Sequence, residues 1–272
     1  MTHEFSYHAP GSIAEALALL AEHGDEAAVL SGGTDLLVNI RSGLSRPRHV
    51  VDIKRIPELK TLSYDRQSGL RIGACVTMNE LLSYAPVTEW FAVLQAAGVE
   101  LATYQLRNRA TPVGNIVTAS PCGDMSSPLL CLDAEVLVVS QNGSRQVPVR
   151  EFITGVQTTA LAPDELVQEL IVPRTYAGAK AGYKKLKRIK GHDLGVVSVA
   201  LITSNGTVRV GIGSAAPTPL LLPDFACGTP AEEIQAAATN AISPIDDVRC
   251  TKEYRAFMVG VFIGRLVEEV GA

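Results

Sequence analysis

The sequence has no apolar run long enough to cross a bilayer, and its first residues, Met1-Thr2-His3-Glu4-Phe5, lack the basic and apolar regions of a signal peptide. We therefore expect a cytoplasmic protein without membrane partners. Aromatic residues are also scarce, at 5 % of the chain. This scarcity argues against a large substrate pocket lined by aromatic rings.

Cysteines are present, but not in the pattern of a metal site. The five of them are scattered, and no two show C-x-x-C spacing: Cys75, Cys122, Cys131, Cys227 and Cys250. We expect reduced thiols, and neither a metal ion nor an iron–sulfur cluster held by this chain. The net charge is −4, and the one dense basic run, residues 184–188, is typical of a solvated strand face. Nucleic acid is therefore not an expected partner.

The segment from Arg107 to Asp124 is the most unusual part of the chain. Two prolines and two glycines interrupt it, so the sequence predicts neither a regular helix nor a strand there. It carries no charge between residues 110 and 123, and its polar side chains are Thr111, Asn115, Thr118 and Ser120. Small side chains allow main-chain N–H groups to approach a polar ligand closely. The alternative is an ordinary surface loop, although loops this long are uncommon without a function.

A second glycine–hydroxyl turn lies near the N-terminus. The apolar run Ala27–Leu30 predicts a strand, Ser31-Gly32-Gly33-Thr34-Asp35 predicts a turn, and a helix is expected from Leu36 to about Arg41. A strand, a glycine turn and a helix in this order can bind an anion through free N–H groups. Taken alone, the glycine pair is more simply a tight turn, and the third glycine of a dinucleotide fingerprint is absent.

The rest of the chain predicts a mixture of helices and strands. Helices are expected after Ser12, after the capping box at Thr77, over 89–102 with an interruption at Gly98, and over 125–132, 231–241 and 252–270. Strands are expected near 48–53, 70–74, 135–140, 145–149, 166–172, 182–188, 195–203 and 207–213. Pro148 indicates that its strand lies at a sheet edge. The pattern changes near residue 170, which suggests a domain boundary.

The two glycine–hydroxyl segments together resemble a known family. Residues 31–36 are similar to the first flavin loop of the FAD-binding subunits of molybdenum hydroxylases, a family that includes xanthine dehydrogenase and carbon monoxide dehydrogenase. Residues 111–116, followed by Ala119-Ser120-Pro121 and Asp124, are similar to the second flavin loop. Lys185, Arg188, Asp193 and the run from Gly211 to Pro217 match the C-terminal region, so the resemblance covers nearly the whole chain.

The resemblance implies a fold of mixed α/β and α+β character. It predicts a PCMH-type FAD-binding domain over residues 1–170, with subdomains of about 1–55 and 56–170. A C-terminal α+β domain over residues 171–272 would hold a small antiparallel sheet with helices.

The resemblance also implies roles for individual residues. The turn 31–35, with the main chain of Gly32, Gly33, Thr34 and Gly114 and the side chains of Thr111 and Asn115, would hold the FAD pyrophosphate. Ser120 and Asp124 would contact hydroxyls on the ribose and adenosine side. Val167 and Lys185 would lie near the isoalloxazine ring; without the resemblance, Lys185 is more simply an exposed strand lysine. Apolar parts of the cradle would be lined by Val29, Leu30, Leu36, Leu101, Leu106 and Val117.

One position departs from the family pattern, which usually has two glycines before the asparagine. This chain has Val113-Gly114. A branched side chain near a pyrophosphate would crowd it, so either Val113 points away from the ligand or flavin affinity is reduced.

The implied function is electron transfer. Electrons from a molybdopterin-binding large subunit would cross the two [2Fe–2S] clusters of a small subunit, reduce FAD on this chain, and pass to an external acceptor such as NAD. No residues of this chain are expected to be catalytic in the hydroxylation. The alternatives are a stand-alone flavin oxidase of the same FAD-binding architecture, or a scaffold subunit that has lost FAD.

Overall fold

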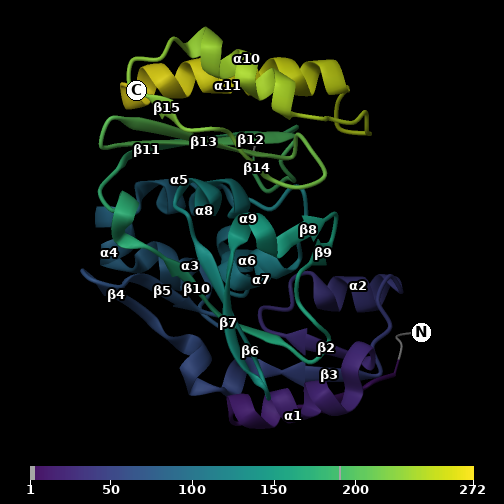
Figure 1. Cartoon of the computed structure of the whole chain (residues 1–272). Helices are drawn as coiled ribbons and strands as arrows, with labels where there is room; N and C mark the ends of the chain where they lie inside the picture. Colours follow the sequence, from purple (N-terminus) through teal and green to yellow (C-terminus); the bar gives the residue numbers. More distant parts are fainter. Residues whose placement is uncertain (1–3, 190) are drawn as a thin grey trace.

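The computed structural model describes residues 4–189 and 191–272. Three main sheets succeed one another along the molecule in Figure 1, from the N-terminal strands at the bottom to the C-terminal helices at the top. No helix among these residues is long and apolar enough to span a membrane.

The N-terminal sheet is parallel and has three strands in the order β1-β3-β2, formed by Ser6–His8, His49–Asp52 and Ala27–Leu30. Helix α1 (Ile13–His23) joins β1 to β2, and α2 (Leu36–Ser42) lies between β2 and β3. Because β2 and β3 are parallel, the turn after β2 and the residues after β3 emerge at the same sheet edge. That edge is where open α/β sheets bind ligands.

The second sheet is antiparallel and has the order β4-β5-β10-β6-β7, formed by Leu62–Asp65, Gly69–Gly73, Leu166–Val172, Glu135–Ser140 and Gly143–Pro148. Strand β7 is the edge strand that Pro148 predicted. Strand β10 comes from far along the chain and completes the sheet centre, with a bulge between Val167 and Glu169.

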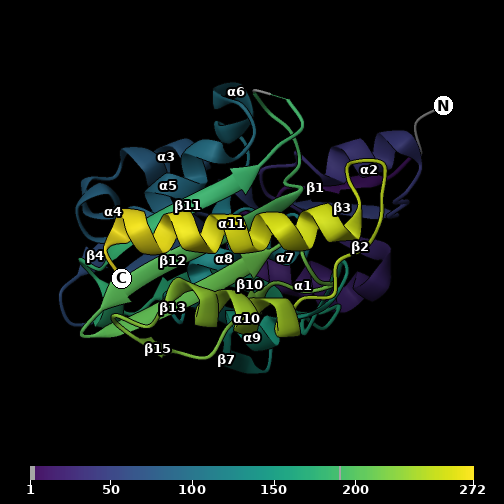
Figure 2. The same cartoon turned by 90° about the horizontal axis from the view of Figure 1, so that it is seen from above.

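The third sheet joins β11 (Lys180–Leu186), β12 (Val197–Ser204), β13 (Thr207–Gly213) and β14 (Leu220–Leu221), and β15 (Phe225–Ala226) also pairs with β13. Alternate residues of β12 enter two different cores. Val199 and Leu201 pack in the cluster with α10 (Ala231–Ala241) and α11 (Lys252–Val270), whereas Ala200 and Ile202 pack toward the rest of the chain. Figure 2 shows α11 lying across this sheet.

Between the second and third sheets lie α5 (Ala92–Glu100) and α8 (Ser126–Cys131). The remaining helices are α3 (Met78–Ser83), α4 (Ala85–Trp90), α6 (Tyr104–Arg107), α7 (Pro112–Val117) and α9 (Val149–Phe152), with 3-10 turns at Gly24–Glu26, Ile53–Arg55, Pro57–Lys60 and Arg174–Tyr176. A small hairpin pairs β8 (Ile153–Gly155) with β9 (Thr158–Thr159).

Two sequence predictions were wrong in detail. The helix expected over 89–102 breaks at Phe91 rather than at Gly98, which lies inside α5. A Cβ on Gly98 would stand 2.8 Å from the Leu82 side chain, so this glycine serves close helix packing. The segment after Thr111 was expected to be irregular, yet it forms α7. Pro112 occupies the first turn, where proline is tolerated, and Thr111 caps the helix by accepting a hydrogen bond from the Gly114 N–H at 2.9 Å.

Candidate functional site

The two glycine–hydroxyl segments lie against each other. A Cβ on Gly32 would come well under 3.0 Å from the Arg109 carbonyl oxygen, a distance that real Cβ atoms do not reach. The Thr118 hydroxyl donates a hydrogen bond to the Asp35 carboxylate at 3.1 Å. The turn after β2 and the segment around α7 therefore meet, although about 80 residues separate them in the chain.

The chain around Ala74 to Met78 holds the two segments in position. The Ser31 hydroxyl donates to the Ala74 carbonyl at 2.8 Å, and the Met78 N–H donates to the Ala110 carbonyl, also at 2.8 Å. One short segment is thus bonded to both turns, which fixes their separation.

The first turn offers main-chain donors. Among residues 4–189 and 191–272, no recorded hydrogen bond uses the backbone N–H of Gly32, Gly33 or Thr34. Gly33 has a φ of +75°, a conformation that favours glycine. Successive free N–H groups in such a turn form a concavity suited to an anion.

Two polar groups of the second segment already form hydrogen bonds within the protein. The Gly114 N–H is taken by Thr111, and the Asn115 side-chain oxygen accepts a hydrogen bond from the Met125 N–H at 3.1 Å. The NH₂ group of the Asn115 side chain still has its two N–H donors. A Cβ on Gly114 would meet only the Thr111 hydroxyl within 4 Å, so space beside this glycine is otherwise open.

A small surface pocket lies where the segments meet. Its lining combines both turns with residues that the sequence did not single out: Ser31, Gly32, Lys54, Cys75, Thr77, Asn108, Arg109 and Thr111. Lys54 follows β3 and brings a positively charged side chain to the pocket that Gly32 lines, where it also pairs with Asp52 at 2.7 Å. The pairing of β3 with β2 brings Lys54 close to the turn, and the sequence alone does not reveal that pairing.

A second polar cluster lies farther along, where β11 meets α5. The Lys185 ammonium is 1 % exposed and lies 2.9 Å from the Asp124 carboxylate, which also accepts a hydrogen bond from the Tyr183 hydroxyl at 3.0 Å. Lys185 is therefore not an exposed strand lysine. Burial raises the pKa of Asp124 above its usual value, although the Lys185 ammonium acts in the opposite direction. Burial and the Asp124 charge raise the pKa of Tyr183, which keeps that phenol a donor.

Comparison with known proteins connects this geometry to a family. The family model described as "FAD binding domain in molybdopterin dehydrogenase" matches residues 3–175. The chain belongs to this family. It is an FAD-binding subunit of the molybdenum hydroxylase type, and FAD is its cofactor.

Whole-length relatives agree. The carbon monoxide dehydrogenase medium chain of Hydrogenophaga pseudoflava is 33 % identical, covering 98 % of this chain and 97 % of the relative. The xanthine dehydrogenase FAD-binding subunit of Escherichia coli O157:H7 is 30 % identical, covering 98 % and 96 %. The solved carbon monoxide dehydrogenase of Hydrogenophaga pseudoflava that lacks the Mo-pyranopterin moiety matches with a TM-score of 0.89 and 31 % identity over 98 % of this chain and 97 % of that one. These matches confirm the predicted fold and an oxidoreductase component.

The apolar residues predicted to line the cradle of this FAD-binding subunit are spread through the structure. Leu30, Leu101 and Val167 are buried, and Val167 lies opposite Val138 in the second sheet. Val29, Leu36 and Val117 are half-buried, whereas Leu106 is 40 % exposed. Ser120 is half-buried and accepts a hydrogen bond from the Cys122 N–H at 3.2 Å. None of these contacts involves the flavin, so the roles of these residues in lining its binding site stay predictions.

Val113 points away from the space beside Gly114. It is 3 % exposed and belongs to the main hydrophobic core with Ile116. Of the two possibilities raised by the valine, the structure therefore supports the first, in which the side chain does not crowd a ligand.

We expect Val113→Gly to destabilise the FAD-binding subunit rather than improve its flavin binding. The change opens a cavity in the core and loosens a short helix, at a cost of roughly 2–4 kcal/mol in unfolding free energy. Urea unfolding measures this cost. The matched control is Val99→Gly, at a helical valine that is 47 % exposed, which should cost at most about 1 kcal/mol. Equal losses for the two variants would show that Val113 packs less than the structure indicates.

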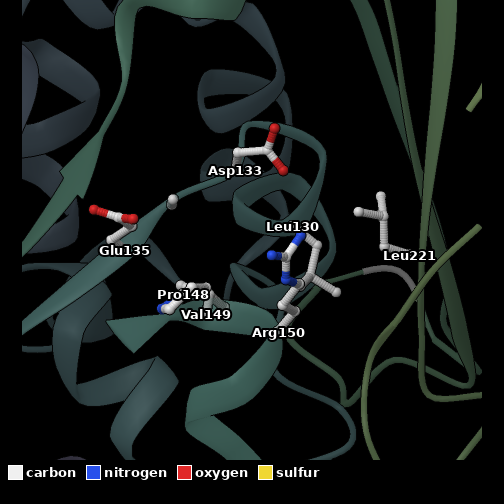
Figure 3. Close-up of a pocket in the computed structure, with 8 residues that line it drawn as sticks. Leu130, Asp133, Glu135, Pro148, Val149, Arg150 and Leu221 are labelled. Carbon is white, nitrogen blue, oxygen red and sulfur yellow. The ribbon is translucent and has the colours of Figure 1, made fainter. Parts of the chain in front are cut away.

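A larger pocket lies elsewhere, between the second sheet and the C-terminal sheet (Figure 3). It is lined by Leu130, Asp133, Ala134, Glu135, Pro148, Val149, Arg150 and Leu221, none of which is a predicted site residue. Asp133 already pairs with the buried Arg209 at 2.7 Å. This ion pair joins Asp133, which follows α8, to β13 of the third sheet.

Proposed function

We propose that the FAD pyrophosphate lies where the two segments meet. The turn 31–35 would supply the main-chain donors of Gly32, Gly33 and Thr34. The second segment would add the side chains of Thr111 and Asn115, and Gly114, whose N–H already bonds to Thr111, would give space for close approach. The observation that carries this proposal is the contact of Gly32 with the Arg109 carbonyl, together with the unused N–H groups of the turn. Lys54 and Arg109 would add positive charge beside a doubly anionic group.

The Asp124–Lys185 contact refines the roles implied by the resemblance. Asp124 was assigned to the adenosine side and Lys185 to the isoalloxazine side, yet the two groups lie 2.9 Å apart. An extended dinucleotide separates its two ends widely, so both residues belong to the same end. We propose the isoalloxazine end, with Val167 nearby and Ser120 on the ribose side. The lysine charge there would favour the anionic reduced cofactor.

This arrangement suits an electron-transfer subunit. When bound, FAD supplies the redox chemistry that links one-electron carriers to a two-electron acceptor. We propose that the carriers are [2Fe–2S] clusters of a small subunit, served by a molybdopterin-binding large subunit, and that the external acceptor is NAD. The relatives called "medium chain" support a complex with a larger and a smaller partner. We also propose a cytoplasmic location.

The division into residues 1–170 and 171–272 belongs to the same proposal. Strand β10, ending at Val172, belongs to the second sheet, whereas β11, from Lys180, belongs to the third. Within the first part, about 1–55 would form the parallel-sheet subdomain and 56–170 the antiparallel one. The Asp124–Lys185 pair then joins the FAD-binding domain to the C-terminal domain.

Copurification tests the function directly. Mild purification from the cells that make the protein should yield this chain with one larger molybdenum-containing and one smaller iron–sulfur chain, identified by mass. The complex should show flavin absorption that bleaches when substrate is added and returns with NAD⁺. Isolation as a lone, active flavin oxidase would overturn the subunit role. Absence of flavin bands after reconstitution with FAD would favour a scaffold.

A further inference from the structure

Three histidines from distant parts of the chain meet at the N-terminal sheet. His8 is the last residue of β1, His23 the last residue of α1, and His49 the first residue of β3. The His8 Nε2 and His49 Nδ1 atoms are 3.0 Å apart, and the His23 and His49 rings stack with centroids 3.6 Å apart. One ring nitrogen from each residue lies within 4.8 Å of the other two. All three side chains are half-buried.

The distance between the His8 and His49 ring nitrogens is close to the distance between two ligands of one tetrahedral metal ion. Two nitrogens bound to one tetrahedral ion at about 2.0–2.1 Å stand about 3.3 Å apart. The His8–His49 distance is already close to that value. His23 must turn about its side-chain bonds to leave the stack and point a ring nitrogen at the ion.

We propose that His8, His23 and His49 form a binding site for a borderline divalent transition-metal ion such as Zn²⁺, with three imidazole ligands and one position open to water. Imidazole is a preferred ligand for such ions, whereas Mg²⁺ and Ca²⁺ prefer oxygen. None of the three histidines is assigned to the flavin, so this inference does not depend on the flavin proposal.

The three histidines come from three different elements, so a bound ion would connect those elements. Strands β1 and β3 are adjacent and parallel, and α1 packs on β3. An ion held by one residue from each would tie the N-terminal strand and the first helix to the centre of the sheet. Because β3 also pairs with β2, which leads into Ser31, such a clip would brace the sheet that presents the first flavin turn.

The test is a Zn²⁺ titration of the full chain without any affinity tag, followed by calorimetry and by competition with a chromophoric chelator. We expect one equivalent to bind, with a rise of several degrees in Tm. Loss of even an outer-shell partner costs about 10–100-fold in metal affinity, so each of His8→Gln, His23→Gln and His49→Gln should weaken binding by at least about 100-fold. The matched control, His192→Gln, should bind as the wild type does.

Folding is checked separately for each variant by circular dichroism in chelator, so that loss of binding is not mistaken for loss of structure. Co²⁺ provides a second readout, because a tetrahedral three-imidazole site gives visible absorption that the variants should lack. Wild-type protein that binds no stoichiometric Zn²⁺ would overturn the proposal. Equal affinity in the wild type and in the folded His49→Gln and His8→Gln variants would overturn it as well.

Discussion

Replacing Gly32 with valine is expected to abolish retention of FAD. The new Cβ would overlap the Arg109 carbonyl, which is main chain and cannot swing aside. The two segments would have to separate, and the donors of the first turn would no longer face the second. A loss of only 1.4 kcal/mol of binding energy raises the Kd tenfold, so the Kd for FAD, measured by titration of the apoprotein, should rise by at least about tenfold. The flavin-to-protein ratio after gel filtration should fall as well.

Gly11→Val is the matched control for this variant. It places the same side chain on another glycine of the N-terminal part, where a Cβ meets only the Glu15 carboxylate at 3.9 Å. The control should retain flavin like the wild type. Gly32→Ala is a gentler second variant, since its Cβ meets the same carbonyl with less bulk beyond it. Unchanged flavin retention in both Gly32 variants would refute the role assigned to this contact.

Replacing Lys185 with methionine is expected to destabilise the protein by about 3–5 kcal/mol, because it leaves the buried Asp124 carboxylate without its cation. Urea unfolding at neutral pH measures the loss. The pKa of Asp124 already lies above its usual value and should rise further in the variant. The folded variant then takes up a proton more readily than the unfolded chain, so its deficit should be largest at neutral pH and shrink on acidification.

Two further variants separate the ion pair from general damage to β11. Lys184→Met changes the neighbouring residue, whose partner Glu269 is exposed, and should cost less than about 1 kcal/mol. The double variant Lys185→Met with Asp124→Asn removes both charges and should recover much of the lost stability. A double variant as unstable as the sum of its single variants would contradict a direct pairing.

Local signals in the sequence predicted many of the elements correctly. The apolar run 27–30, the glycines after it and the helix from Leu36 were expected where β2, the turn and α2 occur. The capping box at Thr77 is present, with both of its hydrogen bonds. These features depend on residues within a few positions of one another, so the sequence suffices to predict them.

Features that depend on distant partners were not predictable. Gly32 was expected to leave room for a ligand, but the space that a Cβ would fill is occupied by the Arg109 carbonyl oxygen. The orientation of Val113 required knowledge of the core, and the burial of Lys185 required its pairing with Asp124. The three histidines have no motif spacing, and only the parallel pairing of β1 with β3 and the packing of α1 bring them together.

A structure of the chain reconstituted with FAD tests the central claim most directly. We expect the diphosphate oxygens within about 2.7–3.2 Å of the main-chain nitrogens of Gly32, Gly33 and Thr34, with α7 on the opposite side. Density for the diphosphate at another location, such as the pocket beside Asp133 and Arg150, with the turn 31–35 left free, would contradict the account.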